Sequence, residues 1–355
     1  MADPNVNEHR SARGRTDARK TEIRSPLGFA TMKNRRIWLI AATVVVVLAT
    51  AFVVHLTRPG DSAPGPWMAK PFLSIAHQGG DGEAPSSTMY AFRRAIAVGA
   101  DMLEMDVHST ADDVLVVMHD AKVDRTTDGS GPVRDKPFRV VRQLDAAFHS
   151  DLRGVRTGDR PPPPGYSAED FMVPSLEEVL TRFPRTPFTV EIKGTSDDDS
   201  ESFVRNARLL AELLQRLHRT QDIIVASFED EAIAEFHKLA PAVGLAPGFN
   251  EVLRYLTLRI RPIDGTVALQ IPVGYRGIKV ATPGFIARAH SDGYAVHVWF
   301  SGTAAEDEAT YSSLIDACAD GLMSSRPTVL EHVLDQRRVA RPGTPGADPC
   351  PATSD

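Results

Sequence analysis

The sequence has few cysteines and no excess of basic residues, and each shortage excludes a class of protein. Only Cys318 and Cys350 occur among 355 residues. Two cysteines are too few for a disulfide framework or a cysteine-rich metal site, and they leave the redox compartment open. The formal net charge is −6, whereas nucleic-acid binding usually needs a basic face. A hydrophobic fraction of 42% and a charged fraction of 24% indicate a globular protein with a sizeable core.

Charged residues are also missing from one long segment near the N-terminus. Residues 37–56, IWLIAATVVVVLATAFVVHL, contain no Asp, Glu, Lys or Arg, and they follow a polar, basic segment, 1–36. At about 1.5 Å per residue, roughly 20 apolar residues span the hydrocarbon core of a bilayer. The segment therefore predicts a single transmembrane helix.

The flanking charges predict how this helix is oriented. Positive charge stays on the cytoplasmic side, so we expect 1–36 to be a basic cytoplasmic tail of a single-pass cell-membrane protein. The rest of the chain would then lie outside the cytoplasm. A buried core helix and a cleaved signal peptide are the alternatives, but the long basic segment and the lack of a convincing cleavage site favour an uncleaved anchor.

Two segments rich in Pro and Gly delimit the part of the chain that we expect to fold. Residues 57–69, which begin TRPGDSAPGPW, predict a linker, and residues 337–355 have the composition of a disordered tail. In the intervening 70–336, strand patterns alternate with amphipathic helix patterns such as those at 88–98 and 203–218. The predicted strands are FLSIAH, MLEMDV, FTVEIK, DIIVAS, AVGLAP, TVALQI, AVHVWF and DGLMSS.

Eight strand–helix units in this region predict an α/β fold, a (β/α)8 TIM barrel, which usually needs about 250 residues. An open doubly wound sheet is the alternative, because patterning cannot prove that the sheet closes. In both folds the functional sites lie at the C-terminal ends of the strands.

Polar side chains occur at these strand ends. His77 ends the first strand, Glu104 and Asp106 end the second, and Glu191 and Lys193 end the third. Each of them alone could be solvated or structural. Together, the three carboxylates would repel one another unless a cation neutralised them, and oxygen ligands favour Mg²⁺ or Ca²⁺ over Zn²⁺.

His108 shares the strand face of Glu104 and Asp106 but lies one pleat further out. This position predicts a loop residue outside the site.

Several stretches of the chain together resemble a known family. The stretches IAHQGG, APSSTMYAFRRAIAVGADMLEMDVHSTADDVLVVMHD and DRTTDGSGPV look like the signature of glycerophosphodiester phosphodiesterases. The resemblance continues in the same order through VPSLEEVL, FTVEIKG, VASF, AVHVWF and ADGLMSSRP, and so covers most of residues 72–335.

The resemblance implies a TIM barrel with a small inserted subdomain, which runs from VLVVMHD to about Met172. It also implies metal-dependent hydrolysis of glycerophosphodiesters to glycerol 3-phosphate and an alcohol. At the matched positions, His77 and His119 would be the catalytic acid–base pair. The metal, Ca²⁺ or Mg²⁺, would be held by Glu104, Asp106 and Glu191, and the substrate would be contacted by Lys193, Gln78 and Trp299.

The chain departs from the family pattern at three places. Gln78 stands where the family usually has Arg, Ser86 and Ser87 replace Glu and Asn, and Ser324-Ser325 replaces a late Thr-Asp pair. Glu83, three residues before Ser86, could stand in for the missing Glu. These changes spare the expected metal ligands and both histidines, but they bear on phosphate contacts and substrate preference.

Two alternatives therefore stay open at this stage. One is lysophospholipase D-type cleavage of membrane lysophospholipids, which the predicted anchor favours. The other is a catalytically silent ectodomain that binds a ligand. The expected partners are the substrate and the membrane, not nucleic acid.

Overall fold

The computed structural model describes residues 41–50, 53, 65–68, 70–152, 160–196, 198–301 and 304–350. The chain divides into two compact units, Met1–Thr57 and Arg58–Asp355. In the first unit, residues 41–50 and 53 are helical and exposed. Within the described ranges, no helix combines the length and apolar character needed to cross a membrane. The predicted span 37–56 lies partly outside these ranges.

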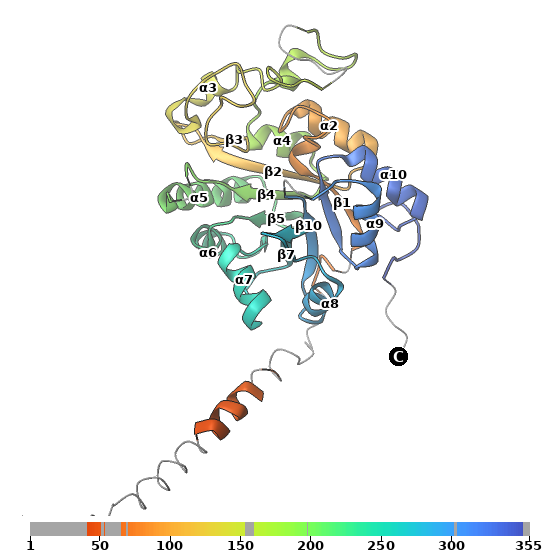
Figure 1. Ribbon diagram of the computed structural model, residues 1–355. Coiled ribbons are helices and arrows are strands. Elements are labelled where there is room, and N and C mark those ends of the chain that lie inside the picture. Colours follow the sequence, from red (N-terminus) through yellow and green to blue (C-terminus); the bar gives the residue numbers. More distant parts are fainter. Residues whose placement is uncertain are drawn as a thin grey trace, which may run out of the picture. The chain divides into compact units, whose positions relative to one another are not determined.

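The second unit is a near-closed barrel of eight parallel strands in the order β6-β5-β4-β2-β1-β11-β10-β7 (Figure 1). Leu245 in β6 also pairs in parallel with Thr266, just before β7, which brings the two ends of the sheet together. The strands are β1 (Leu73–Ala76), β2 (Met102–Ser109), β4 (Phe188–Ile192), β5 (Ile223–Ala226), β6 (Gly244–Leu245), β7 (Ala268–Pro272), β10 (Ala295–Trp299) and β11 (Gly321–Ser324).

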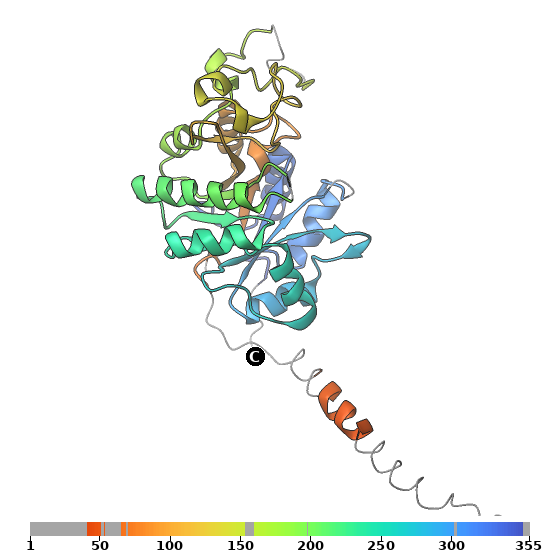
Figure 2. The same ribbon diagram turned by 90° about the vertical axis from the view of Figure 1, so that its left-hand side faces the viewer.

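Helices cover the outside of this sheet (Figure 2). Apolar side chains from both layers form the core. Each predicted strand segment overlaps one strand of the barrel, so the predicted TIM-barrel architecture is confirmed. The helices around it are α2 (Met89–Val98), α4 (Leu176–Arg182), α5 (Ser200–Arg216), α6 (Asp230–Leu239), α7 (Phe249–Leu258), α8 (Pro283–Ser291), α9 (Glu308–Asp316) and α10 (Pro327–Arg337).

The turn after β1 is held tightly against α2, and this contact positions the first histidine of the site. Thr88 caps α2 by accepting a hydrogen bond from the Ala91 N–H, and Gly99 ends the helix with a φ of 118°. Gly79 has a φ of 80°, and a Cβ there would come within 2.8 Å of the Ala91 side chain. Any larger residue at position 79 would push the turn that carries His77 away from α2.

An insertion between β2 and α4 forms a small subdomain beside the barrel, drawn in yellow at the top of Figures 1 and 2. Its strand β3 (Leu115–Val117) pairs antiparallel with the end of β2. The short helices η2 (Val133–Asp135), α3 (Phe138–Val141) and η3 (Ala168–Phe171) follow. The insertion has a core of its own, which includes Val116, Met118, Val123, Val133, Val141, Ala146 and Val173.

The C-terminal segment differs from the predicted disordered tail over residues 338–350. Cys350 forms a disulfide with Cys318, and Val339 makes a β-bridge with Ala347. Arg341 is buried and pairs with Glu331 on α10. Composition alone cannot reveal these contacts, because they depend on a cysteine and a carboxylate elsewhere in the chain. Residues 351–355 lie outside the described residues.

Candidate active site

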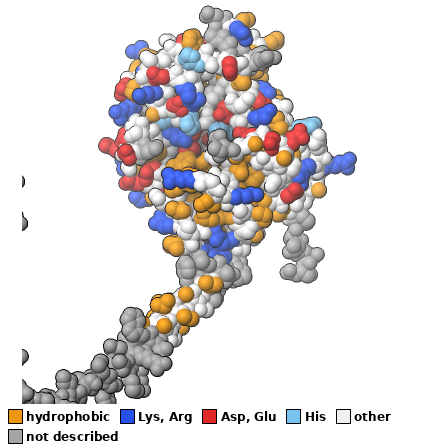
Figure 3. Space-filling view, in the orientation of Figure 1, with side chains coloured by type: hydrophobic (Ala, Val, Ile, Leu, Met, Phe, Trp, Pro, Cys, Tyr) orange, Lys and Arg blue, Asp and Glu red, His pale blue; other side chains and the backbone are white. Residues whose placement is uncertain are grey.

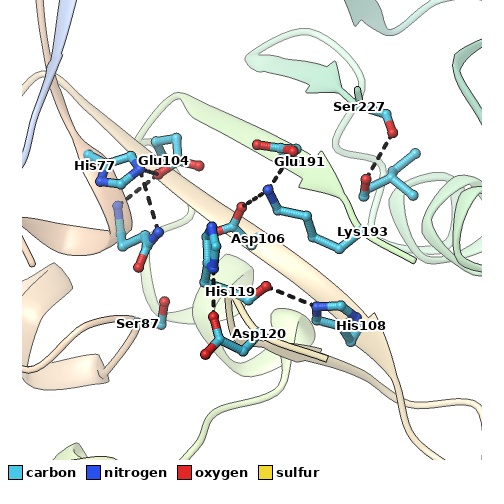
Figure 4. Close-up of polar contacts among 12 residues, drawn as sticks. His77, Ser87, Glu104, Asp106, His108, His119, Asp120, Glu191, Lys193 and Ser227 are labelled. Atoms are coloured by element: carbon cyan, nitrogen blue, oxygen red, sulfur yellow. Dashed lines mark hydrogen bonds and ion pairs between the residues drawn. The ribbon is translucent and has the colours of Figure 1, made fainter. Parts of the chain in front are cut away.

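Three carboxylates meet where β2 and β4 end. In the register of the two strands Asp106 pairs with Glu191, and Glu104 lies two residues earlier on the same face of β2. One oxygen from each carboxylate lies within 4.8 Å of the other two. Figure 4 shows Lys193 reaching between Asp106 and Glu191, with Glu104 beside His77. The period-two pattern of the sequence predicted this convergence.

The charges in this cluster are not balanced. Burial and the neighbouring Asp106 carboxylate raise the pKa of Glu104 to about 8. Burial also raises the pKa of Glu191, although Lys193 opposes the shift. Lys193 Nζ lies 2.6 Å from Glu191 Oε1 and 3.1 Å from Asp106 Oδ1. The Lys193 ammonium therefore pairs with two of the three carboxylates.

The same cluster fits a hard divalent cation. Asp106 Oδ2 is buried and has no hydrogen-bond partner among the described residues, which is costly unless something else pairs with it. The available ligand atoms are all oxygens, the donor type that Ca²⁺ and Mg²⁺ prefer. Glu104, Asp106 and Glu191 could therefore hold such an ion.

His77 lies next to this cluster at the end of β1. Its Nδ1 is 3.0 Å from Asp81 Oδ1, and its Nε2 is 4.0 Å from Glu104 Oε2. Burial by itself would lower the pKa of His77, but Glu104 and Asp81 outweigh it and raise the pKa to about 10. The imidazolium form is thus favoured at neutral pH.

His119 follows β3 and is positioned by a second carboxylate. Its Nδ1 is 2.7 Å from Asp120 Oδ1. Arg125 donates two hydrogen bonds to Asp120, of 2.6 and 3.0 Å, and lowers the pKa of Asp120 to about 2. With Nδ1 engaged by an ionised carboxylate, Nε2 of His119 is the atom left to exchange a proton.

His108 is not a loop residue, so that prediction is wrong. It lies within β2 and is buried, with its Nε2 3.1 Å from the backbone carbonyl of His119. The antiparallel pairing of β3 extends β2 beyond the barrel rim and encloses this ring. His108 therefore supports the backbone of His119.

Gln78 lies between the histidine and the carboxylates. It is buried with a φ of 48°, and its backbone N–H donates to Glu104 Oε2 at 2.7 Å. Its side-chain carbonyl accepts a hydrogen bond from Ser86 Oγ at 2.5 Å. Glu83 does not take the place of the missing family glutamate, since it pairs with Arg94 and accepts a hydrogen bond from Thr328.

A cavity of about 650 Å³ adjoins these residues and has a polar end and an apolar end. His77, His119, the three carboxylates and Lys193 lie at the polar end. Trp299, at the end of β10, also lines the cavity and packs edge-on against Phe228, with 5.9 Å between ring centroids. The rest of the apolar wall includes Phe249, Val252, Leu253, Leu256, Tyr275 and Phe300.

Sequence reasoning gave no role to Asp81, Asp120, Arg125 or the apolar wall. A signal existed for two of them, since Asp120 directly follows His119 and Asp81 comes four residues after His77. Arg125 and the wall residues from α7 carried no such signal, because they reach the site only through the fold.

The sequence of this chain is similar to those of several known proteins. A glycerophosphodiester phosphodiesterase of Bacillus subtilis is 30% identical over 200 residues, which cover 55% of this chain and 66% of that protein. Lysophospholipase D GDPD1 of Rattus norvegicus is 27% identical over 299 residues, covering 74% of this chain and 87% of that protein.

The fold has solved relatives as well. The structure of an Oleispira antarctica phosphodiesterase in complex with the product sn-glycerol-3-phosphate aligns with a TM-score of 0.57 at 22% identity, covering 75% of this chain and 97% of that chain. Residues 77–329 match the glycerophosphoryl diester phosphodiesterase family, more than half of the chain. The chain therefore belongs to this family and is a phosphodiesterase that hydrolyses glycerophosphodiesters.

Proposed function

We propose that hydrolysis to glycerol 3-phosphate and an alcohol depends on Ca²⁺ or Mg²⁺ held by Glu104, Asp106 and Glu191. The observation that carries this proposal is the clustering of three carboxylates within 4.8 Å beside a buried oxygen that lacks a partner among the described residues. Bound there, the cation would supply Lewis-acid stabilisation of the charge that develops on the phosphoryl oxygens. A chelator should abolish turnover, and added Mg²⁺ or Ca²⁺ should restore it.

The chain's own residues orient the phosphodiester and move the protons. Lys193 is suited to contact a phosphate oxygen from the cavity floor, and Gln78 offers a neutral amide where an arginine would offer a charged fork. One histidine accepts a proton from the attacking oxygen, and the other protonates the leaving alkoxide. With both histidines lining the cavity of a family phosphodiesterase, we do not retain the catalytically silent alternative.

Replacing Lys193 by Ala should reduce turnover about tenfold or more, because a charge-assisted hydrogen bond contributes about 1.5–3 kcal/mol. The variant should also bind the divalent cation more tightly, since Lys193 now occupies Glu191 Oε1 and Asp106 Oδ1. Initial rates measured against metal concentration report both effects.

Lys238→Ala is the matched control for Lys193, because Lys238 lies exposed on α6 and pairs with Glu235 at the surface. It should leave both the rate and the metal dependence unchanged. A Lys193→Ala enzyme as active as the parent would show that the phosphate is held elsewhere.

A second candidate substrate is a lysophospholipid, as the name of the rat relative suggests. The observation that favours it is the apolar end of the cavity, built from Phe228, Trp299 and α7 side chains. Glycerophosphocholine leaves these walls without an apolar partner. The acyl chain of a lysophospholipid would cover them, and each buried methylene contributes about 0.8 kcal/mol.

A series of monomeric lysophosphatidylcholines with increasing acyl length, together with glycerophosphocholine, tests this candidate. If the chain lies in the cavity, KM should fall by up to about fourfold per methylene until the cavity is filled. A KM that does not depend on acyl length would favour the water-soluble glycerophosphodiester instead.

We also propose that residues 37–56 anchor the protein in the cell membrane with the barrel outside the cytoplasm. The apolar, uncharged segment behind a basic tail supports this placement. The Cys318–Cys350 disulfide supports it independently, because disulfides persist in oxidising compartments and are rare in the cytosol.

Protease added to intact cells should remove the barrel and leave a short, protected N-terminal piece. Immunoblotting with a tag at each end follows both products. A barrel that resists digestion until the membrane is broken would reverse this topology, and a released mature form would indicate a cleaved signal.

A further inference from the structure

Large apolar side chains lie exposed around the mouth of the cavity. Phe228 and Ile278 expose 50% and 69% of their surface, and Phe249, Leu253 and Tyr275 are also exposed. We call these five residues the hydrophobic rim. Four of them also line the cavity, and only Ile278 lies beyond it. Figure 3 shows hydrophobic side chains gathered in the hollow of this face, with Lys and Arg side chains at its edges.

The outermost part of the rim is a short hairpin made of β8 (Gly274–Tyr275) and β9 (Ile278–Lys279). Tyr275 and Ile278 are cross-strand partners, so they lie side by side. Arg276 and Gly277 form the turn with φ values of 48° and 83°, the left-handed pair that two-residue hairpin turns require. The Tyr275 ring lies 5.6 Å from the Phe249 ring, which ties the hairpin to α7.

The chain segment that contains the hairpin carries charge of one sign. Residues 265–291 contain no Asp or Glu, and the hairpin itself carries Arg276 and Lys279, both exposed. Aromatic and aliphatic side chains flanked by cations form the combination that enters the headgroup region of a bilayer and is attracted to anionic lipids. Exposed apolar patches that border a substrate cavity mark such contact sites.

We propose that the hydrophobic rim is a membrane-contact surface: Ile278 and Tyr275 enter the headgroup–acyl boundary of a bilayer that contains anionic lipid. The cavity mouth would then open onto the lipid phase. The entry of a lysophospholipid through this mouth rests on the proposed function, whereas the membrane contact of the hydrophobic rim does not. A second copy of the chain is a poorer occupant, because a symmetric contact through the hairpins would bring Arg276 and Lys279 of both copies together without an acidic residue from 265–291 to offset them.

The contact can be measured with the full-length protein in vesicles of phosphatidylcholine and phosphatidylglycerol. Both native cysteines are joined in a disulfide, so Ile278→Cys accepts a fluorescent label selectively. Leu239→Cys is the matched control, because Leu239 is an exposed leucine that ends α6, at the barrel end opposite the cavity mouth. A lipid-attached quencher should reduce the fluorescence at position 278 several-fold more than at position 239.

Activity provides a second readout. Ile278→Ser and Lys279→Glu should lower turnover of lysophosphatidylcholine in these vesicles several-fold while leaving glycerophosphocholine turnover unchanged, and Leu239→Ser should change neither. Equal quenching at positions 278 and 239 would overturn the proposal. The proposal would also fail if the label at position 278 became shielded from solvent without lipid, to a degree that grows with protein concentration. A parent enzyme inactive on both substrates would contradict the proposed function, while the quenching result would still decide the contact.

Discussion

Glu104→Gln should reduce turnover of glycerophosphocholine about a thousandfold or more at saturating Mg²⁺ or Ca²⁺. A bound cation contributes several kcal/mol of transition-state stabilisation, and about 1.4 kcal/mol corresponds to a factor of ten in rate. The glutamine keeps an oxygen that can accept the Gln78 N–H, so the turn after β1 should stay in place. Initial rates across a metal titration measure the loss, and Asp106→Asn and Glu191→Gln should behave in the same way.

The fold should survive this change, and that separates a lost ligand from a lost structure. Burial and Asp106 raise the pKa of Glu104, so a neutral amide there relieves repulsion in the metal-free protein. The thermal unfolding midpoint in chelator should be equal to that of the parent or higher. Glu83→Gln is the matched control, since Glu83 pairs with Arg94 instead of lining the cavity, and it should retain full turnover. Full activity in all three ligand variants would contradict the metal assignment.

The polar end of the site was predictable because two simple regularities coincide there. Side chains alternate along a strand, so Glu104 and Asp106 had to share a face. Parallel strands in a barrel end at one rim, so Glu191 and His77 had to approach them. Both rules require only the local residue pattern and the fold class, and the sequence indicates that pattern and that class.

The apolar end was not predictable in the same way. Its wall comes from α7 and the β8–β9 hairpin, whose residues look like ordinary amphipathic or loop sequence. Their role depends on where α7 lies relative to β6 and β7, which no local pattern encodes. The disulfide escaped prediction for the same reason, because 32 residues separate the two cysteines and only the packing of the C-terminal segment brings them together.

Gln78 was predictable from the sequence in one respect and not in another. The sequence identifies it as a departure from the family pattern, but it does not reveal that the backbone N–H of the residue, rather than its side chain, contacts Glu104 at 2.7 Å. That hydrogen bond is available to any residue except proline. The exchange of a charged side chain for Gln78 therefore leaves the support of Glu104 intact.

His77→Ala and His119→Ala should each lower kcat by about 10²–10⁴-fold, with a smaller effect on KM, because proton transfer acts in the transition state. The two variants should differ when the leaving group no longer needs a proton. Asp81 and Glu104 favour the protonated form of His77, which makes His77 the expected acid. A nitrophenyl phosphodiester of glycerol should therefore restore most of the rate of His77→Ala and little of the rate of His119→Ala.

The structure also supplies the controls for this division of roles. His332→Ala changes an exposed histidine on α10, outside the cavity, and should have no effect on either substrate. Asp120→Asn should lower the rate of proton transfer by His119 without abolishing it, since Asp120 and Arg125 hold the His119 ring through its Nδ1. Its defect should follow that of His119→Ala and show no rescue by the nitrophenyl substrate. Rescue of both histidine variants, or of neither, would mean that the acid and the base are not separate residues. Rescue of His119→Ala alone would reverse the assignment and make the Asp120-bound histidine the proton donor.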